Sequence, residues 1–187
     1  MNIERNKILA LVDTYSDATR EHLHQVGTIM EYFAEKLWED SDYWWAVGIL
    51  HDIDRDYVEK DATRHLKEAL DNIWAEISMS EEMKWDIRSH WYFLEWITEQ
   101  PDTLIRKYLC AVDELSGFMW AYFRMLPSDD VMDIKVKSIK KKIKDKSFAS
   151  GVDRHEVKNC ENLLEISLDD FIEDMKQWLK KYADTKA

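Results

Sequence analysis

The chain has 187 residues, 45% of them hydrophobic and 34% charged, so it is long enough to bury one sizeable core beneath a well-solvated surface. The formal net charge of −12 argues against nucleic acid as the main partner, because phosphate backbones are bound by an excess of lysine and arginine. The same charge disfavours an anionic substrate unless a metal or a local basic patch reverses the field at the site.

Glycine and proline are sparse, with four and two residues, which is typical of long helices joined by short loops. No internal repeat, linker or clear run of alternating apolar and polar residues interrupts the chain. The sequence predicts a single all-α domain of about six to nine helices. Its core is expected over about residues 18–125, followed by a C-terminal helical extension over about 126–187.

The first third of the chain contains the helix expected at the centre of the core. A long amphipathic helix is predicted from about 18 to 37, capped by Ser16 or Asp17. The next helix, from 42 towards 52, is apolar on nearly every side, as in a helix that other helices surround. A polar loop is expected at 54–61.

Helical patterns continue through the rest of the chain. Helices are predicted at about 62–77 and from Ser80 onwards, and Pro101 in a first turn is expected to open another that carries Asp113. A lysine-rich helix follows the turn at 127–130. The remaining boundary signals are Gly151 as a stop, Asp153 and Glu156 as a capping box, and Ser167 as the cap of the last helix.

Features of the chain also bear on its location. Cys110 and Cys160 are too few for a disulfide framework and are expected to be buried free thiols. The N-terminus lacks the apolar stretch of a signal peptide, and the densest apolar run, residues 43–50, is too short to span a bilayer. The sequence therefore predicts a cytoplasmic protein that does not enter a membrane.

Five polar side chains occupy helix positions that should be apolar. A buried carboxylate is costly unless it is paired or bound to a cation. Two carboxylates and three imidazoles that converge from different helices are jointly satisfied by a divalent metal. The five residues are His22, His51, Asp52, His90 and Asp113.

Two other histidines are interpreted as surface residues. His24 follows His22 by two positions, so it points about 200° away around the helix axis. His155 lies in a charged segment. Each histidine considered alone is more often a satisfied core residue than a ligand, so the metal hypothesis depends on the combination.

The combination resembles the HD superfamily of metal-dependent phosphohydrolases. The matching segments are H-L-H-Q-V at 22–26, I-L-H-D-I-D at 49–54, I-R-S-H at 87–90 and C-A-V-D-E-L-S-G-F at 110–118. The segment at 138–154 is similar to one in an uncharacterised bacterial subgroup of predicted HD hydrolases. The resemblance covers about residues 18–180 and implies an all-α HD-domain bundle.

This resemblance implies roles for individual residues. His22, His51, Asp52 and Asp113 are expected to bind the first metal, for which the candidates are Mn, Fe, Zn, Co, Ni and Mg. His65 and His90 would ligate a second metal or contact the substrate phosphate. We expect one tightly bound metal, with both histidines on the substrate.

The predicted reaction is hydrolysis of a phosphomonoester or nucleotide by metal-activated water. Asp52, His65 and His90 are the expected catalytic residues, with Asp52 orienting the water or bridging two ions. Some single-metal nucleotidases of the superfamily carry an acidic general base shortly after the pair at 51–52; Asp54 and Asp56 are available here, neither matches that pattern cleanly, and the general base is left open. The alternative is a catalytically idle metal-binding or protein-binding helical module.

Basic residues are candidates for binding the phosphate of a small metabolite or nucleotide. These are Arg55, Arg88, Lys146 and Arg154, each of which also fits a solvated surface. Seven lysines crowd residues 135–146, either as the outer face of an amphipathic helix or as a positive rim that attracts an anionic substrate. The oligomeric state stays open.

Overall fold

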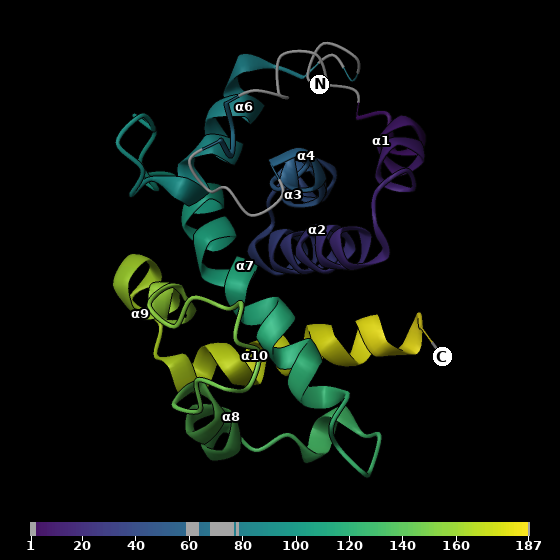
Figure 1. Ribbon diagram of the computed structural model, residues 1–187, viewed down its shortest axis with the longest axis vertical. Helices are drawn as coiled ribbons and strands as arrows, with labels where there is room; N and C mark the ends of the chain where they lie inside the picture. The colour runs from purple at the N-terminus through teal and green to yellow at the C-terminus, as the bar shows by residue number, and fades with distance from the viewer. Residues whose placement is uncertain (1–2, 59–63, 68–76, 78, 187) are drawn as a thin grey trace. The chain divides into compact units, whose positions relative to one another are not determined.

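The computed structural model describes residues 3–58, 64–67, 77 and 79–186, and all regular structure in this part of the chain is helical (Figure 1). The predicted all-α fold is therefore confirmed. The α-helices are α1 (Arg5–Val12), α2 (Asp17–Leu37), α3 (Ser41–Leu50), α4 (Arg55–Val58), α6 (Glu81–Arg88), α7 (Leu104–Phe123), α8 (Val136–Ile143), α9 (Asn159–Leu164) and α10 (Leu168–Asp184). Short 3-10 helices are η1 (Ser89–Trp91), η2 (Val131–Asp133) and η3 (Glu156–Lys158).

The chain divides into two compact units, residues 1–106 and 107–187. Helix α7 begins at the end of the first unit and continues in the second. The prediction of one domain with a core up to about residue 125 stays a prediction. Among the helices described, none is both long enough and apolar enough to cross a membrane.

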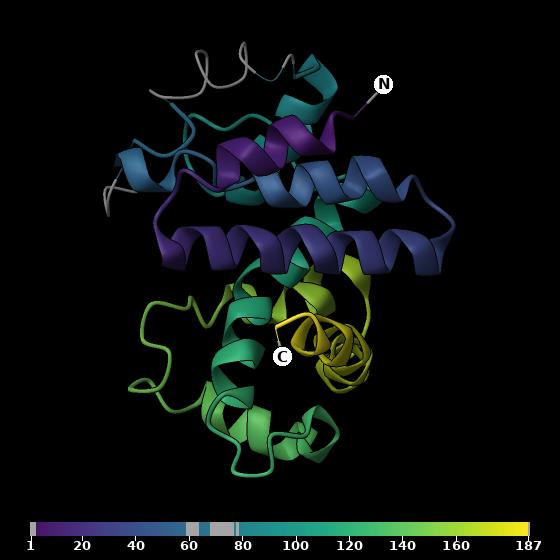
Figure 2. The same ribbon diagram turned by 90° about the vertical axis from the view of Figure 1, so that its right-hand side faces the viewer.

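Helix α3 lies at the centre of the first unit, as its apolar sequence predicts. Every residue from Trp44 to Leu50 is buried. The helix runs antiparallel along α2 and also contacts α1 and α6 (Figures 1 and 2). Asp40 caps its N-terminus, because the Asp40 carboxylate accepts a hydrogen bond from the Tyr43 N–H at 3.0 Å.

Two glycines allow the backbones of α2 and α3 to approach closely. A Cβ added to Gly27 would lie 2.9 Å from the Cβ of Ile49. A Cβ added to Gly48 would lie 2.7 Å from the carbonyl oxygen of Val26 and 3.0 Å from the Cα of Gly27. Backbone atoms cannot move aside as the end of a flexible side chain can, so the spacing of these helices requires glycine at position 48.

The N-terminus of α2 is tied to α4 by Asp56. Its carboxylate accepts hydrogen bonds from the Ser16 N–H at 2.7 Å, the Ser16 hydroxyl at 2.9 Å and the Thr19 hydroxyl at 2.5 Å. Desolvation opposes the charged form, but these hydrogen bonds outweigh it and lower the pKa of Asp56. Ser16 is the N-cap residue, as predicted, although its hydroxyl serves Asp56 instead of the helix N–H groups.

Helix α10 supplies much of the apolar face of the second unit. It contacts α8, α9 and η2. Ser167 caps it as predicted, because the serine hydroxyl accepts the Asp170 N–H at 3.2 Å. The predicted inner face is buried and consists of Leu168, Phe171, Ile172, Met175, Leu179 and Tyr182.

Cys110 and Cys160 are buried free thiols, as predicted. Burial raises the pKa of Cys160 to about 12 and raises that of Cys110 as well. Both side chains are therefore neutral packing residues at physiological pH.

The segment after α3 differs from the prediction. The expected polar loop contains the short helix α4, because the Asp54 carbonyl accepts the N–H of Val58 at 3.0 Å. The helix predicted at 62–77 lies largely outside the described residues. Within it the structure describes a turn at 64–67 and residue 77.

Other boundaries also differ. Pro101 lies in a bend and does not open a helix, since α7 begins at Leu104. The capping box expected from Asp153 and Glu156 does not form. Instead, the Asp153 carboxylate accepts the His155 N–H at 2.7 Å, a local turn that competes with helix capping, and Glu156 begins η3. Helix α1 was not predicted.

The glycine contact between α2 and α3 can be tested by substitution. We expect Gly48→Ala to lower the free energy of unfolding by about 1–3 kcal/mol, because the new Cβ would meet backbone atoms of α2. This outweighs the preference for alanine within helices, which is about 1 kcal/mol. Chemical denaturation measures the change.

Gly151→Ala is the control, because nothing lies within 4 Å of a Cβ at that position. It should change the free energy of unfolding by less than about 0.5 kcal/mol. Equal stability of the two variants would show that the contact between α2 and α3 accommodates a Cβ.

Candidate metal centre

The C-terminal end of α3 carries the first two residues of the candidate centre. His51 is the C-cap of the helix and is fully buried, and Asp52 is 5% exposed. The Nδ1 of His51 lies 2.7 Å from the Gly48 carbonyl oxygen. A carbonyl can only accept, so Nδ1 carries this proton and the Nε2 of the ring is directed towards His22 and Asp52.

His22 reaches this end of α3 from α2. Its Nε2 lies 3.2 Å from the Nε2 of His51 and 3.5 Å from Oδ2 of Asp52. The side chain is 17% exposed, so the prediction that His22 lies on the buried stripe is confirmed only in part. The close approach of the two helices brings these imidazoles together.

A second pair of histidines lies on the other side of Asp52. The Nε2 atoms of His65 and His90 are 3.4 Å apart and lie 3.3 and 3.4 Å from Oδ1 of Asp52. His90 is on η1, where its Nδ1 lies 2.5 Å from the Ile87 carbonyl oxygen. This contact places the proton on Nδ1 and leaves the Nε2 of neutral His90 with a lone pair.

His65 is oriented by Asp54, a residue that is fully buried. The Nδ1 of His65 lies 2.7 Å from Oδ1 of Asp54, and Oδ2 of Asp54 accepts the Leu66 N–H at 2.6 Å. Trp91 packs against the imidazole, with the ring centroids 4.7 Å apart. The sequence analysis missed both contacts, since it considered Asp54 only as a general base.

Asp52 is the central charge of the cluster. Its Oδ2 faces His22 and His51, whereas its Oδ1 faces His65 and His90. Burial opposes ionisation of Asp52, but the four histidines outweigh it and hold its pKa well below the usual range. The group is therefore a carboxylate whenever the protein is folded near neutral pH.

The protonation state of His90 also suits a metal. Burial lowers the pKa of His90, and the charge of Asp52 only partly opposes this effect. His90 is therefore neutral near pH 7 and can act as a ligand. One ligand atom each from His51, Asp52 and His90 lies within 4.8 Å of the others, which is close enough for all three to bind one ion.

The four basic residues expected to bind phosphate have different surroundings. Nη1 of Arg55 lies 2.5 Å from Oδ2 of Asp52, so this half-exposed side chain reaches the cluster. Arg88 lies near Glu99, with 3.6 Å between their charged atoms. Lys146 is an exposed residue of the second unit, where Arg154 donates hydrogen bonds to backbone carbonyls.

The remaining candidates are placed as follows. Asp113 is a half-buried residue of α7 in the second unit, and its carbonyl accepts the Ser116 hydroxyl at 2.8 Å. Its role as a fourth ligand stays a prediction. Asp56 is engaged at the start of α2, and Asp54 faces His65, so both carboxylates have structural partners. We therefore assign the role of general base to neither Asp54 nor Asp56.

His24 and His155 were both expected at the surface. His155 is exposed. The prediction for His24 is wrong, because this residue is half-buried. Helix α2 is covered over more of its circumference than the predicted stripe, since both neighbours of His24, Leu23 and Gln25, are buried. His24 is not among the groups of side chains close enough to share an ion.

In the described residues, buried histidines surround an aspartate in a helical domain, and such a group of side chains could hold a metal ion. The family model of the HD domain matches residues 19–117, and the chain belongs to this family. Its members are in general metal-dependent phosphohydrolases. Comparisons with curated proteins and with solved structures found no match. The bacterial subgroup stays a prediction.

The histidines of α2 provide a matched test of the metal centre. We expect His22→Ala to reduce bound divalent metal by at least about tenfold at limiting metal concentration, because an inward-facing nitrogen is lost. His24→Ala should leave metal content unchanged. Elemental analysis of the two purified variants measures this, and equal loss in both would contradict the assignment of His22.

Proposed function

We propose that the chain is a metal-dependent phosphohydrolase that acts on a phosphomonoester or a nucleotide through metal-activated water. The observation that carries the proposal is the burial of Asp52 between two pairs of imidazoles. A divalent cation satisfies a buried carboxylate and converging nitrogen lone pairs together. Membership of the HD domain family supports chemistry on a phosphate.

The first ion in this proposal is held by His22, His51 and Asp52, with Asp113 as the fourth ligand. Imidazole and carboxylate ligands suit Mn, Fe, Co, Ni or Zn, and Mg is a further candidate. Such an ion lowers the pKa of a bound water and offsets the negative charge of the phosphate.

His65 and His90, which face Oδ1 of Asp52, are better suited to hold a second ion than to contact phosphate directly. His90 is neutral, with its proton directed at the Ile87 carbonyl. Its Nε2 therefore has a lone pair and no proton to donate to a phosphate oxygen. His65, His90 and Oδ1 of Asp52 together form a three-atom donor set. We therefore extend the proposal to two ions, of which the second would be held by His65, His90 and Asp52, in place of the single ion expected from the sequence.

Arg55 is the basic residue best placed to meet a substrate phosphate. Its guanidinium contacts the same Asp52 oxygen that faces His22 and His51. The half-exposed guanidinium lies beside the residues that would hold the ion, where it could contact a phosphate oxygen. Roles for Arg88, Lys146 and Arg154 in substrate binding stay proposals.

A substrate screen tests the proposed activity. Purified protein loaded with Mn, Fe, Co, Ni, Zn or Mg is assayed for phosphate release from a panel of phosphorylated metabolites and nucleotides. We expect hydrolysis of at least one compound, reduced by at least about 100-fold in Asp52→Asn. Asp113→Ala should reduce both hydrolysis and metal content if Asp113 is a ligand.

The alternative function is a catalytically idle metal-binding or protein-binding module. It predicts metal binding without phosphate release from any compound and with any ion. His24→Ala serves as the folded control in the screen, since its activity should equal that of the unchanged protein. Activity that survives Asp52→Asn and complete metal removal would contradict a metal-dependent mechanism.

Metal stoichiometry distinguishes one ion from two. We expect two ions per chain in the fully active protein and one in His90→Ala, because that variant loses one donor of the second set. Elemental analysis at saturating metal, with protein concentration from amino-acid analysis, gives the ratio. One ion per chain in both proteins, with turnover alone reduced in His90→Ala, would restore the single-ion arrangement.

A further inference from the structure

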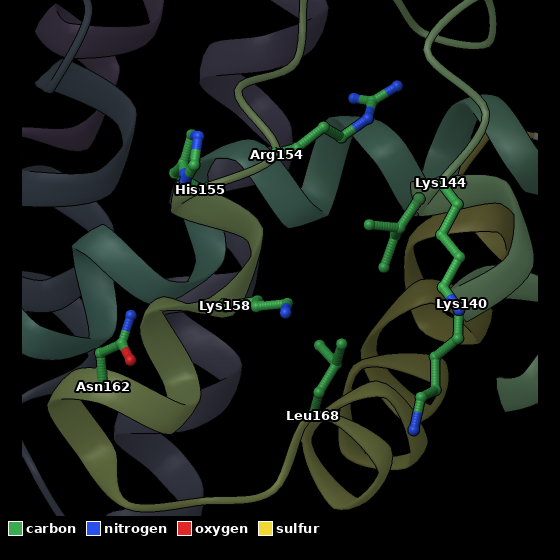
Figure 3. Close-up of a pocket in the computed structure, with 8 residues that line it drawn as sticks. Lys140, Lys144, Arg154, His155, Lys158, Asn162 and Leu168 are labelled. Carbon is green, nitrogen blue, oxygen red and sulfur yellow. The ribbon is translucent and has the colours of Figure 1, made fainter.

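The second unit contains a pocket with a volume of about 430 Å³, within the range of small-molecule sites (Figure 3). Its walls come from α8 and its C-cap Lys144, from the segment that includes η3, from Asn162 of α9 and from the start of α10. Cationic side chains surround an apolar patch formed by Ile143 and Leu168. The four cations that line it are Lys140, Lys144, Arg154 and Lys158.

The charge of this pocket contrasts with that of the whole chain. Among the described residues, its lining contains no aspartate or glutamate, although the chain carries a net charge of −12. Lys140 is paired with Asp169 at 2.6 Å. Within the described residues, neither Lys144 nor Lys158 forms an ion pair. The local field therefore favours an anion.

Arg154 adds a positive charge that no carboxylate offsets among the described residues. Its guanidinium donates to the carbonyl oxygens of Ala149 and Val152 at 3.1 and 2.9 Å and also to that of Phe148. It lies over the ring of Phe118, 5.0 Å from the centroid. These contacts hold the arginine in one position while leaving its charge uncompensated.

The lysines of α8 divide between the pocket and the solvent. Lys140 and Lys144 line the pocket, whereas Lys137 and Lys141 do not. Ile139 and Ile143 are buried on the inner face of the helix. An amphipathic helix explains the outer lysines but does not explain a pocket whose cations come both from α8 with its C-cap and from the segment at 154–158.

We propose that this pocket is a second binding site, for a small organic phosphate with an apolar group. The phosphate would lie between the ammonium groups of Lys144 and Lys158, and the apolar group would lie on Ile143 and Leu168. A duplex or a single-stranded nucleic acid is a poorer fit, because the rest of the acidic chain would repel its backbone. The pocket shares no residue with the histidine and aspartate cluster, so the inference goes beyond the proposed function.

Calorimetric titration of 1-naphthyl phosphate into EDTA-treated protein tests the proposal. Metal removal prevents binding at an ion and prevents hydrolysis. We expect one site per chain, with weaker binding of inorganic phosphate, which lacks the apolar group, and of 1-naphthol, which lacks the charge. Because the protein is metal-free, binding here does not depend on whether the proposed hydrolysis is found.

Two double variants with the same change in net charge distinguish binding in this pocket from nonspecific electrostatic attraction to the lysines. We expect Lys144→Gln with Lys158→Gln to weaken binding by at least about tenfold. Lys137→Gln with Lys141→Gln should change it by less than about twofold. Thermal unfolding checks that both remain folded. Absence of binding, or equal weakening in both double variants, would overturn the proposal, as would loss of binding in His22→Ala.

Discussion

The close contact between α2 and α3 is the constraint on which the first unit depends. Gly27 and Gly48 remove the side chains that would keep the two backbones apart. His22 precedes one glycine by five residues and His51 follows the other by three, so the antiparallel helices bring the two imidazoles together. Their Nε2 atoms are 3.2 Å apart. Glycine, which weakens a helix by its flexibility, here determines the geometry of the centre.

Asp52 is buried just beyond the end of α3, and the surrounding imidazoles stabilise its charge. The Nδ1 atoms of three imidazoles point away from Asp52 towards oxygen atoms of the protein. The acceptors are a carbonyl of α3 for His51 and a carbonyl of α6 for His90, whereas the Nδ1 of His65 lies beside the Asp54 carboxylate. Such outer contacts hold ring orientation and tautomer before a cation binds, so less entropy is lost on binding. The carboxylate then presents one oxygen to each pair of imidazoles.

An acidic chain that is to bind a phosphate needs local sources of positive charge. The first unit offers a cluster of histidine and aspartate side chains, the candidate metal centre, with Arg55 beside it. The second unit offers a pocket of lysine and arginine side chains, with Arg154 held by backbone carbonyls. These two sources of positive charge differ physically. A bound ion concentrates charge at one point, whereas the pocket distributes it over several flexible ammonium groups. The net charge of −12 therefore describes the surface as a whole and not either of these places.

The sequence by itself determined the helical class, the buried position of α3 and the choice of His51, Asp52 and His90 as polar exceptions on apolar faces. These properties follow from periodicity within one helix, where neighbouring residues decide the pattern. Only the tertiary structure decided which oxygen of Asp52 faces which imidazoles, that Asp54 supports His65, and that the lysines of α8 divide between pocket and solvent. Those features depend on the distance between helices and on carbonyl groups at helix ends, which no local pattern specifies.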